Sequence, residues 1–396
     1  MLRFKALCTA LLFFSFAQAQ QPRQEMRAVW IATVNNIDYP LKPTTNSATL
    51  QQEFIRLLDM HQRNGMNAIV MQVRPATDAF YPSPLEPWSQ WLTGTQGQPP
   101  VPYFDPLAFM IEETHKRKME FHAWMNPYRA VFNTKSSSVA PTHVTRLHPE
   151  WFVTYGDTKY FDPGNKEVQK FVTMVVQDVV RRYNVDAIHF DDYFYPYRIA
   201  GKEFPDEASY AKYGNGLSRA DWRRSNTDSI ILSLSKVIKK ENNKCQFGIS
   251  PFGIWRNINK DPRGSNTIGG QSNYDDLYAD ILLWLEEGWI DYVAPQLYWE
   301  IGHKIADFNL LIDWWSKNTF GKNCYIGVGI YRAGSNAAWR DKTQIPRQIN
   351  KIRNTPNING MIFFSSKTFE KNPYGWNDTL RYNFFSQPAL PPNPTF

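Results

Sequence analysis

Two spacings of apolar residues alternate along the chain. Short runs rich in β-branched and aromatic residues occupy residues 27–34, 68–75, 119–128, 186–193, 245–254, 291–300, 324–332 and 360–369. Residues 48–65, 162–184, 273–289 and 306–318 instead place apolar side chains at helical spacing. Strands that are each followed by a helix or a long loop predict an α/β fold, a (β/α)8 TIM barrel. A doubly wound open sheet is the rival. We favour the barrel because neither a G-x-G-x-x-G motif nor a P-loop follows the first strand.

Two of the predicted helices carry end signals. Gly65 stands at the C-terminal cap position of the helix over residues 48–65. Asp162 is predicted to cap the next helix, with Pro163 in its first turn.

Long segments follow the carboxyl ends of the second to fifth strands, at residues 76–106, 130–162, 194–214 and 255–271. This is the end of the barrel where TIM-barrel enzymes build their sites. Loops of this length are usually functional or disordered. Their Trp, Tyr and Pro content favours ordered walls around a site at this end.

Alternation within each strand predicts which side chains face the barrel axis. Apolar residues such as Ile188 and Phe190 face outward to pack on helices, so their neighbours face inward. The inward set is Gln72, Arg74, His122, Trp124, Asn126, His189, Asp191, Tyr193, Ser250, Gln296, Tyr298, Glu300 and Tyr331. A structural barrel core would be layered with branched apolar residues. Polar groups that converge from several strands therefore predict an active-site floor.

Several of these residues allow a structural and a functional interpretation. We interpret His122 and His189 as hydrogen-bonded core histidines rather than metal ligands, because no H-E-x-x-H motif accompanies them. Arg74 either pairs with Asp191 or binds a substrate carboxylate. Asn126 is expected to donate a hydrogen bond to a sugar hydroxyl or to the Asp191 carboxylate. The tryptophans that either pack or act as stacking platforms for sugars are Trp88, Trp91, Trp124 and Trp299.

Glycoside hydrolysis usually requires two carboxylates across the scissile bond. Asp191 is the best candidate for one of them. Asp192 has the opposite parity, so it caps the following turn unless the strand has already ended and the side chain reaches the mouth. Glu300 is the best second carboxylate by parity, and Asp78 and Glu203 lie in bordering loops. If the substrate carries an N-acetyl group, its carbonyl can be the nucleophile instead. The sequence leaves both mechanisms open.

The N-terminal residues 1–19 are predicted to be a cleavable signal peptide. Arg3 and Lys5 form its basic start, an apolar stretch follows, and small residues end at Ala19. The apolar stretch is shorter than the roughly 20 residues of a membrane span. Cys8 lies inside it, so a lipid-attachment cysteine is not expected. We expect one domain over residues 20–385, a Pro-rich tail over 386–396, a periplasmic or secreted location and no integral membrane segment.

Cysteine content and charge narrow the class of protein further. Cys245 and Cys324, at the starts of predicted strands, are expected to be buried thiols rather than part of a disulfide framework. The formal charge of +7 becomes +5 once Arg3 and Lys5 are removed. This mild, dispersed basic charge weakly favours an acidic polymer and does not indicate specific reading of DNA. We expect no nucleic-acid partner, no metal and no cofactor.

The motif IHFDDYFYPY at residues 188–197 resembles the glycosyl hydrolase-like 10 family, as do RAVWIATV, MQVRP, FHAWMNPYR, ISPFGIWRN and VAPQLYW. The resemblance spans Arg27 to Phe369. It implies a TIM-barrel glycosidase of the cell envelope, acting in one branch on peptidoglycan glycan strands stripped of peptide. It also implies that Asp191 and Asp192 are a catalytic pair, or a catalytic and an orienting residue.

The sequence therefore predicts an exported glycoside hydrolase that cleaves an amino-sugar polymer by carboxylate acid–base catalysis. The catalytic candidates are Asp191, Asp192 and Glu300. The substrate-binding candidates are Gln72, Arg74, His122, Trp124, Asn126, Arg129, His189, Tyr193, Gln296, Tyr298, Trp299 and Tyr331. Two alternatives stay open: a non-catalytic carbohydrate-binding barrel, and a metal-dependent hydrolase or deacetylase that uses His122, His189 and Asp191.

Overall fold

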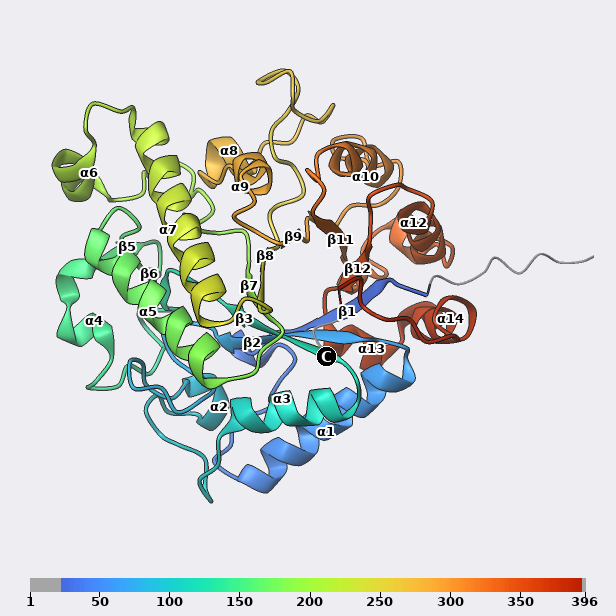
Figure 1. Cartoon of the computed structure of the whole chain (residues 1–396), viewed down its shortest axis with the longest axis horizontal. Coiled ribbons are helices and arrows are strands. Elements are labelled where there is room, and N and C mark those ends of the chain that lie inside the picture. The colour runs from blue at the N-terminus through green and yellow to red at the C-terminus, as the bar shows by residue number, and fades with distance from the viewer. Residues whose placement is uncertain (1–22, 394–396) are drawn as a thin grey trace, which may run out of the picture.

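A closed barrel of parallel strands forms the centre of the molecule (Figure 1). The structure is a computed structural model that describes residues 23–393. The barrel strands are β1 (Met26–Ile31), β2 (Ala68–Arg74), β3 (Glu120–Met125), β7 (Ala187–Phe190), β8 (Gln246–Ile249), β9 (Tyr292–Val293) with β10 (Gln296–Leu297), β11 (Asn323–Val328) and β12 (Gly360–Phe363). Strand β12 pairs with β1, which closes the sheet. The predicted (β/α)8 barrel is confirmed.

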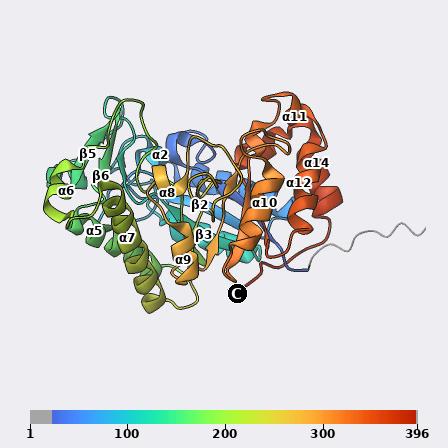
Figure 2. The ribbon, with the colours of Figure 1, turned by 90° about the horizontal axis from the view of Figure 1, so that it is seen from above.

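Helices surround the strands. The longer ones are α1 (Ser47–Arg63), α3 (Pro106–Lys116), α5 (Lys166–Arg182), α7 (Arg219–Glu241), α10 (Phe308–Lys317) and α12 (Gln344–Arg353). Shorter ones are α2 (Gln90–Thr93), α4 (Val144–Leu147), α6 (Glu207–Tyr213), α8 (Asn273–Asp276), α9 (Ile281–Glu286), α11 (Ala337–Arg340), α13 (Ser366–Lys371) and α14 (Trp376–Thr379). In Figure 2, α5 and α7 lie at one end of the molecule and α10 and α12 at the other, with β2 and β3 between them. Within residues 23–393, none of the helices has both the length and the apolarity of a membrane span.

The sequence located helix ends with mixed success. Helix α1 ends as predicted, with Gly65 following it at φ +76°. The cap predicted for α5 is wrong. Asn165 caps that helix by accepting a hydrogen bond from the Glu167 amide, whereas Asp162 accepts one from the Gly164 amide in the turn before it.

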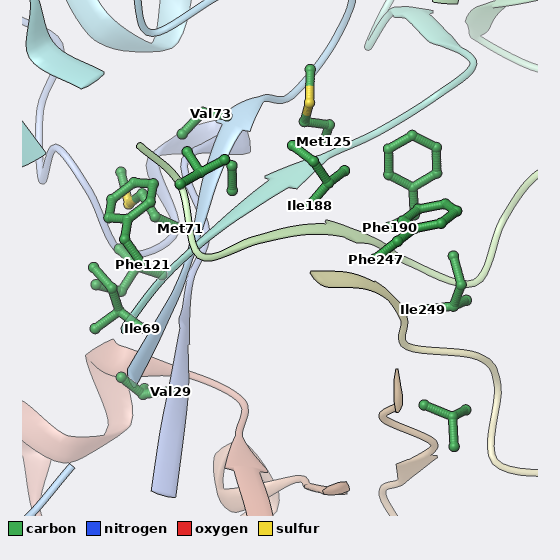
Figure 3. Close-up of a cluster of buried hydrophobic side chains, with 14 of the residues drawn as sticks. Val29, Ile69, Met71, Val73, Phe121, Met125, Ile188, Phe190, Phe247 and Ile249 are labelled. Atoms are coloured by element: carbon green, nitrogen blue, oxygen red, sulfur yellow. The ribbon is translucent and has the colours of Figure 1, made fainter. Parts of the chain in front are cut away.

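Apolar side chains on the outer faces of the strands form the main core. Ile69, Met71, Ile188 and Phe190 belong to one cluster (Figure 3). Residues of the surrounding helices, such as Val176, belong to the same cluster. The sequence neighbours of the strand residues belong to a second cluster inside the barrel, which includes Trp30, Val70, Trp124, Ala187, Tyr292 and Tyr325. The predicted alternation of outward and inward residues is therefore correct. It carries the inward side chains to the carboxyl ends of the strands.

Three details depart from the predicted layout or add to it. The segment after β3, predicted as a loop, contains an antiparallel sheet of β4 (Arg129–Val131), β6 (Thr158–Phe161) and β5 (Phe152–Tyr155). The sixth barrel strand is interrupted at Ala294 and Pro295, and its two halves pair separately with β11. In the Pro-rich tail, Leu390 exchanges backbone hydrogen bonds with Arg23 and Glu25. Cys245 and Cys324 are buried free thiols, as predicted.

Candidate active site

A cavity of about 310 Å³ opens at the carboxyl ends of the barrel strands. Its volume lies at the lower end of the range of small-molecule sites. Residues from β1, β3 and β10, and from the segments after β1, β3, β7, β8, β10 and β12, line the cavity. They are Trp30, Ala32, Val34, Asn35, Ile37, Trp124, Arg129, Phe132, Asp191, Asp192, Tyr193, Ser250, Gln296, Tyr298 and Phe364. Among them, Asp191 and Asp192 are the carboxylates.

Asp191 lies in the cavity wall with 5% of its surface exposed. Its Oδ2 accepts hydrogen bonds from the Trp124 indole at 3.2 Å and from the Asn126 amide. Its Oδ1 is buried and accepts no hydrogen bond within the described chain. Burial raises the pKa of Asp191 to about 6, although the nearby Arg129 cation opposes the rise. Asp191 therefore lines the cavity as a buried carboxylate that is held by two donors and has one oxygen unpartnered among the described residues.

Asp192 lines the same cavity with 4% of its surface exposed. It reaches the cavity despite its opposite parity because β7 ends at Phe190, so both aspartates follow the strand. Its Oδ2 accepts a hydrogen bond from the Tyr197 hydroxyl. Burial, together with the negative charge of Asp191, raises the pKa of Asp192 to about 7. A carboxyl group with a pKa near neutrality is suited to general acid–base catalysis.

Arg129 links Tyr193 of the cavity lining to Asn126 and Pro75. The Arg129 guanidinium donates hydrogen bonds to the Tyr193 hydroxyl, to Asn126 Oδ1 and to the Pro75 carbonyl, each at 2.9 Å. Gln72 also donates to Asn126 Oδ1, and Gln72 Oε1 accepts from the backbone amides of Thr33 and Val34. The amide of Asn126 is thereby fixed with its NH₂ group toward Asp191.

The two predicted core histidines lie inside the barrel, fully buried. Both bind the Tyr292 hydroxyl through Nδ1 at 2.9 Å. The other ring nitrogen of His122 is bonded to Glu120, and that of His189 to Ser250. Across residues 23–393, no three His, Cys, Asp or Glu side chains form a cluster that could hold a metal ion. The structure therefore does not group His122, His189 and Asp191 as the metal alternative requires.

Arg74 takes neither of its two predicted roles. Its guanidinium forms two hydrogen bonds with the Glu86 carboxylate, and both side chains are buried. It also donates to the carbonyls of Asn126 and Pro127. Arg74 therefore holds the segment after β2 against the segment after β3, rather than binding Asp191 or a ligand.

Glu300 does not lie at the cavity, in contrast to the expectation from parity. Its carboxylate accepts hydrogen bonds from Asn336 at 3.2 Å and from the Trp339 indole at 3.0 Å. The chain turns after β10, which ends at Leu297, and parity no longer applies three residues later. The structure thus brings Asp191 and Asp192 together and places Glu300 apart from them.

The other candidates divide between cavity and scaffold. Trp124, Tyr193, Gln296 and Tyr298 line the cavity, and the half-exposed ring of Tyr331 packs edge-on against Tyr298 beside it. The remaining candidates lie outside the cavity lining: Trp88 against Tyr103, Trp91 against Phe132, Trp299 against Phe252, Asp78 bonded to Gln96, and Glu203 beside Arg223.

Two groups of site residues were not predicted. Trp30 lies in β1, Asn35 in the turn after it and Phe364 directly after β12, where the runs are almost wholly apolar and show no polar convergence. The contact of Tyr197 with the site was not predicted because this residue lies beyond the end of β7, where side chains no longer alternate between two faces. Its position five residues after Asp192 in an aromatic run was the available signal.

Known proteins that resemble this chain in sequence are described as glycosyl hydrolases. A family model described as Glycosyl hydrolase-like 10 matches residues 25–363. The chain is 46% identical over 391 residues to "Glycosyl hydrolase YngK" of Bacillus subtilis, covering 97% of this chain and 76% of that protein. It is 39% identical over 381 residues to "Glycosyl hydrolase DigH" of Escherichia coli K12, covering 90% and 86%.

Solved structures share the fold at low sequence identity. The glycoside hydrolase domain of PgaB (BpsB) from Bordetella bronchiseptica aligns with a TM-score of 0.55 at 13% identity, covering 91% of this chain and 99% of that one. An α-L-fucosidase isoenzyme 2 from Paenibacillus thiaminolyticus aligns with a TM-score of 0.56 at 10% identity, covering 92% and 49%. These likenesses concern the barrel fold alone.

Proposed function

This chain belongs to the glycosyl hydrolase-like 10 family and is a glycoside hydrolase, and from that premise we propose that it is an exported enzyme that hydrolyses peptide-free peptidoglycan glycan strands. The observation that carries the proposal is the pair of buried carboxyl groups, Asp191 and Asp192, in one cavity with pKa values raised to about 6 and about 7. Acid–base cleavage of a glycosidic bond needs one carboxyl that is protonated and another that is ionised at working pH.

The cavity walls support a sugar as the ligand. Trp30, Phe364 and Tyr298 form a continuous aromatic surface, with ring centroids 6.1 and 5.9 Å apart along the series. Aromatic faces bury the apolar faces of pyranose rings, and Gln296, whose amide nitrogen donates to the Ser250 carbonyl, adds a polar side chain to the same lining.

The positive charge of Arg129 supports an acidic polymer as the substrate. The hydrogen bonds that this cavity-lining cation donates within the described chain go to uncharged oxygens. Peptide-free strands carry a free carboxylate on every muramic acid unit, and a guanidinium is the side chain best suited to a carboxylate. The mild positive charge of the chain is of the same sign.

The proposal is tested with purified protein and peptide-free glycan strands. We expect release of new reducing ends, and a loss of kcat of about 10²–10⁴-fold in both Asp191→Asn and Asp192→Asn, which is the range that general acid–base catalysis contributes. Asp228→Asn is the matched control. The pKa of Asp228 is also raised to about 6 by burial, but it lies on α7 and binds the Trp284 indole. Intact strands after prolonged incubation, or unchanged activity in both site variants, would refute the proposal.

Export is a separate part of the proposal. Residues 1–19 lie outside the described residues, and their basic, apolar and small-residue order supports a signal peptide. We expect the full chain to appear in the periplasmic or culture fraction and a chain lacking residues 2–19 to stay in the cytoplasm. Equal distribution of the two proteins would exclude a signal role.

A further inference from the structure

Asp191 and Asp192 are the carboxylates of the cavity lining. They are consecutive residues after β7, and both line the cavity wall. Direct displacement by a protein carboxylate, and displacement by a carboxylate-activated water, both need an acid and a nucleophile or base on opposite faces of the sugar. Of the other candidate acids, Glu300 is bonded to Asn336 and Trp339, Asp78 to Gln96, and Glu203 lies beside Arg223. None of the three lines the cavity.

The surroundings of Asp191 suit an amide rather than a reacting carbon. Two donors, from Trp124 and Asn126, hold Oδ2, so the carboxylate is fixed in orientation. The buried Oδ1 has no hydrogen-bond donor within the described chain, and such an unpartnered acceptor can take a ligand N–H once the carboxyl group turns toward the cavity that Asp191 lines. The indoles of Trp30 and Trp124 and the ring of Tyr298 offer an apolar surface for a methyl group within the same cavity.

We infer that the nucleophile is the carbonyl oxygen of the substrate's own 2-acetamido group, with Asp191 binding its N–H and Asp192 serving as the acid and base. This inference rests on the proposed function, because it requires an N-acetylated amino sugar at the cleaved bond. It identifies the sugar unit that the cavity accepts and assigns different roles to the two aspartates.

The reaction balances without a second protein nucleophile. Asp192 gives its proton to the glycosidic oxygen as the bond from that oxygen to C1 breaks, and the acetamido oxygen forms a new bond to C1. The product is a cyclic oxazolinium, whose positive charge Asp191 stabilises through the N–H. Asp192, now ionised, takes a proton from water as the water oxygen attacks C1 and the bond from C1 to the acetamido oxygen breaks. Both displacements occur at C1, so the sugar keeps its anomeric configuration.

The contacts of each aspartate match its role. Asp192 must start protonated and end protonated, and burial together with the negative charge of Asp191 favours its neutral form. Asp191 must remain ionised: burial raises its pKa to about 6, and the Arg129 cation and the Trp124 and Asn126 donors oppose that rise and favour its charged form. The Tyr197 hydroxyl, which donates to Asp192, orients the carboxyl that moves the proton.

The test compares peptide-free glycan strands with the same strands after N-deacetylation, and follows the anomer released by the wild-type enzyme with NMR. We expect the first product to retain its configuration and deacetylated strands to be cleaved at least about 100-fold more slowly, because a positioned intramolecular nucleophile is lost. A thiazoline analogue of N-acetylglucosamine should inhibit competitively. In Asp191→Asn, its affinity should fall at least about tenfold, since the amide that replaces the carboxylate lacks its charge.

The outcomes separate the mechanism from the function. Cleavage with inversion, or equal cleavage of both kinds of strand, overturns the inference and leaves the proposed function in place. No cleavage of either strand overturns the proposed function, and the inference that rests on it falls too. Thiazoline binding that is unchanged in Asp191→Asn overturns the role given to Asp191, and this binding readout does not need an active variant.

Discussion

Tyr197 shows how much one side chain outside the strand pattern can matter to the site. Its hydroxyl donates a hydrogen bond to Asp192, and such a bond favours the ionised carboxylate and lowers the pKa of Asp192. Burial and the charge of Asp191 act in the opposite direction and prevail. The titration of the proposed acid is therefore a balance that a single hydroxyl group adjusts.

We expect Tyr197→Phe to move the basic limb of the kcat profile to higher pH by about one unit. A hydrogen bond to a charged group contributes about 1.5–3 kcal/mol, and one pKa unit corresponds to about 1.4 kcal/mol. Removing the donor raises the pKa of Asp192, so the acid stays protonated to higher pH. Tyr382→Phe, at a tyrosine 62% exposed on the outer surface, is the control and should leave the profile unchanged. A basic limb that stays in place would show that Asp192 is not the titrating acid.

At the scale of single residues, alternation predicted the site within the strands and one residue past their ends. Asp191, Trp124 and Asn126 meet at one point because they occupy inward positions near the ends of β7 and β3. Prediction failed at Glu300, which lies past the end of β10. It also failed for the pairing of Arg74, because its partner Glu86 is twelve residues away in a segment without periodicity.

The Arg74–Glu86 pair links two elements, the end of β2 and the segment that follows it. Both side chains are almost completely removed from solvent. Removing one partner leaves a buried charge without its counterion, which costs about 3–5 kcal/mol, whereas replacing both with apolar residues is often close to neutral. We therefore expect Arg74→Met and Glu86→Leu each to lower the free energy of unfolding by about 3–5 kcal/mol. The double variant should lose far less than the sum.

Urea unfolding of the four proteins in this cycle measures the coupling. The exposed pair Lys135–Asp157 is the control, and its coupling should not exceed about 1 kcal/mol. Additive losses at Arg74 and Glu86 would show that the two charges do not depend on each other.

Elements were predicted well where periodicity was long and poorly where local hydrogen bonds decide. The 17-residue helices α1 and α5 follow from apolar spacing. The start of α5 was misplaced because Asp162 and Asn165 are both good capping residues, and the three-residue difference depends on how the turn at Gly164 closes. The antiparallel sheet after β3 was missed because its strands are only three or four residues long, too short for alternation to identify.

Over the whole molecule, buried titratable groups make stability depend on pH in opposing ways. The pKa values of His61 and His143 are lowered by burial to about 3 and about 4, so stability rises with pH from those values up to the unfolded value of 6.5. Buried aspartates act the other way. Those whose pKa is raised to about 6 or 7 are Asp38, Asp78, Asp191, Asp192 and Asp228. The free energy of unfolding of the wild type, followed against pH, contains the contributions of both groups. The difference between a variant and the wild type isolates the contribution of one residue.

The two site aspartates should therefore reduce the stability of the enzyme at the pH where it works. Their folded pKa values of about 6 and about 7 exceed the ordinary value of 3.8, so between these limits the folded state holds protons that the unfolded state has released. Stability from that protonation is complete below pH 3.8 and is lost as pH rises through 6 to 7. An asparagine does not titrate and is close in shape to the neutral acid.

We expect Asp191→Asn and Asp192→Asn to match the wild type at pH 4 and to exceed its free energy of unfolding at pH 7.5 by on the order of 1–3 kcal/mol. Thermal melts at pH 4, 5.5 and 7.5 measure the difference, with exposed Asp157→Asn as a control whose curve should follow the wild type throughout. A site variant less stable than the wild type at pH 7.5 would mean that the ionised carboxylates stabilise the folded state. The two aspartates would then not lower stability in exchange for activity.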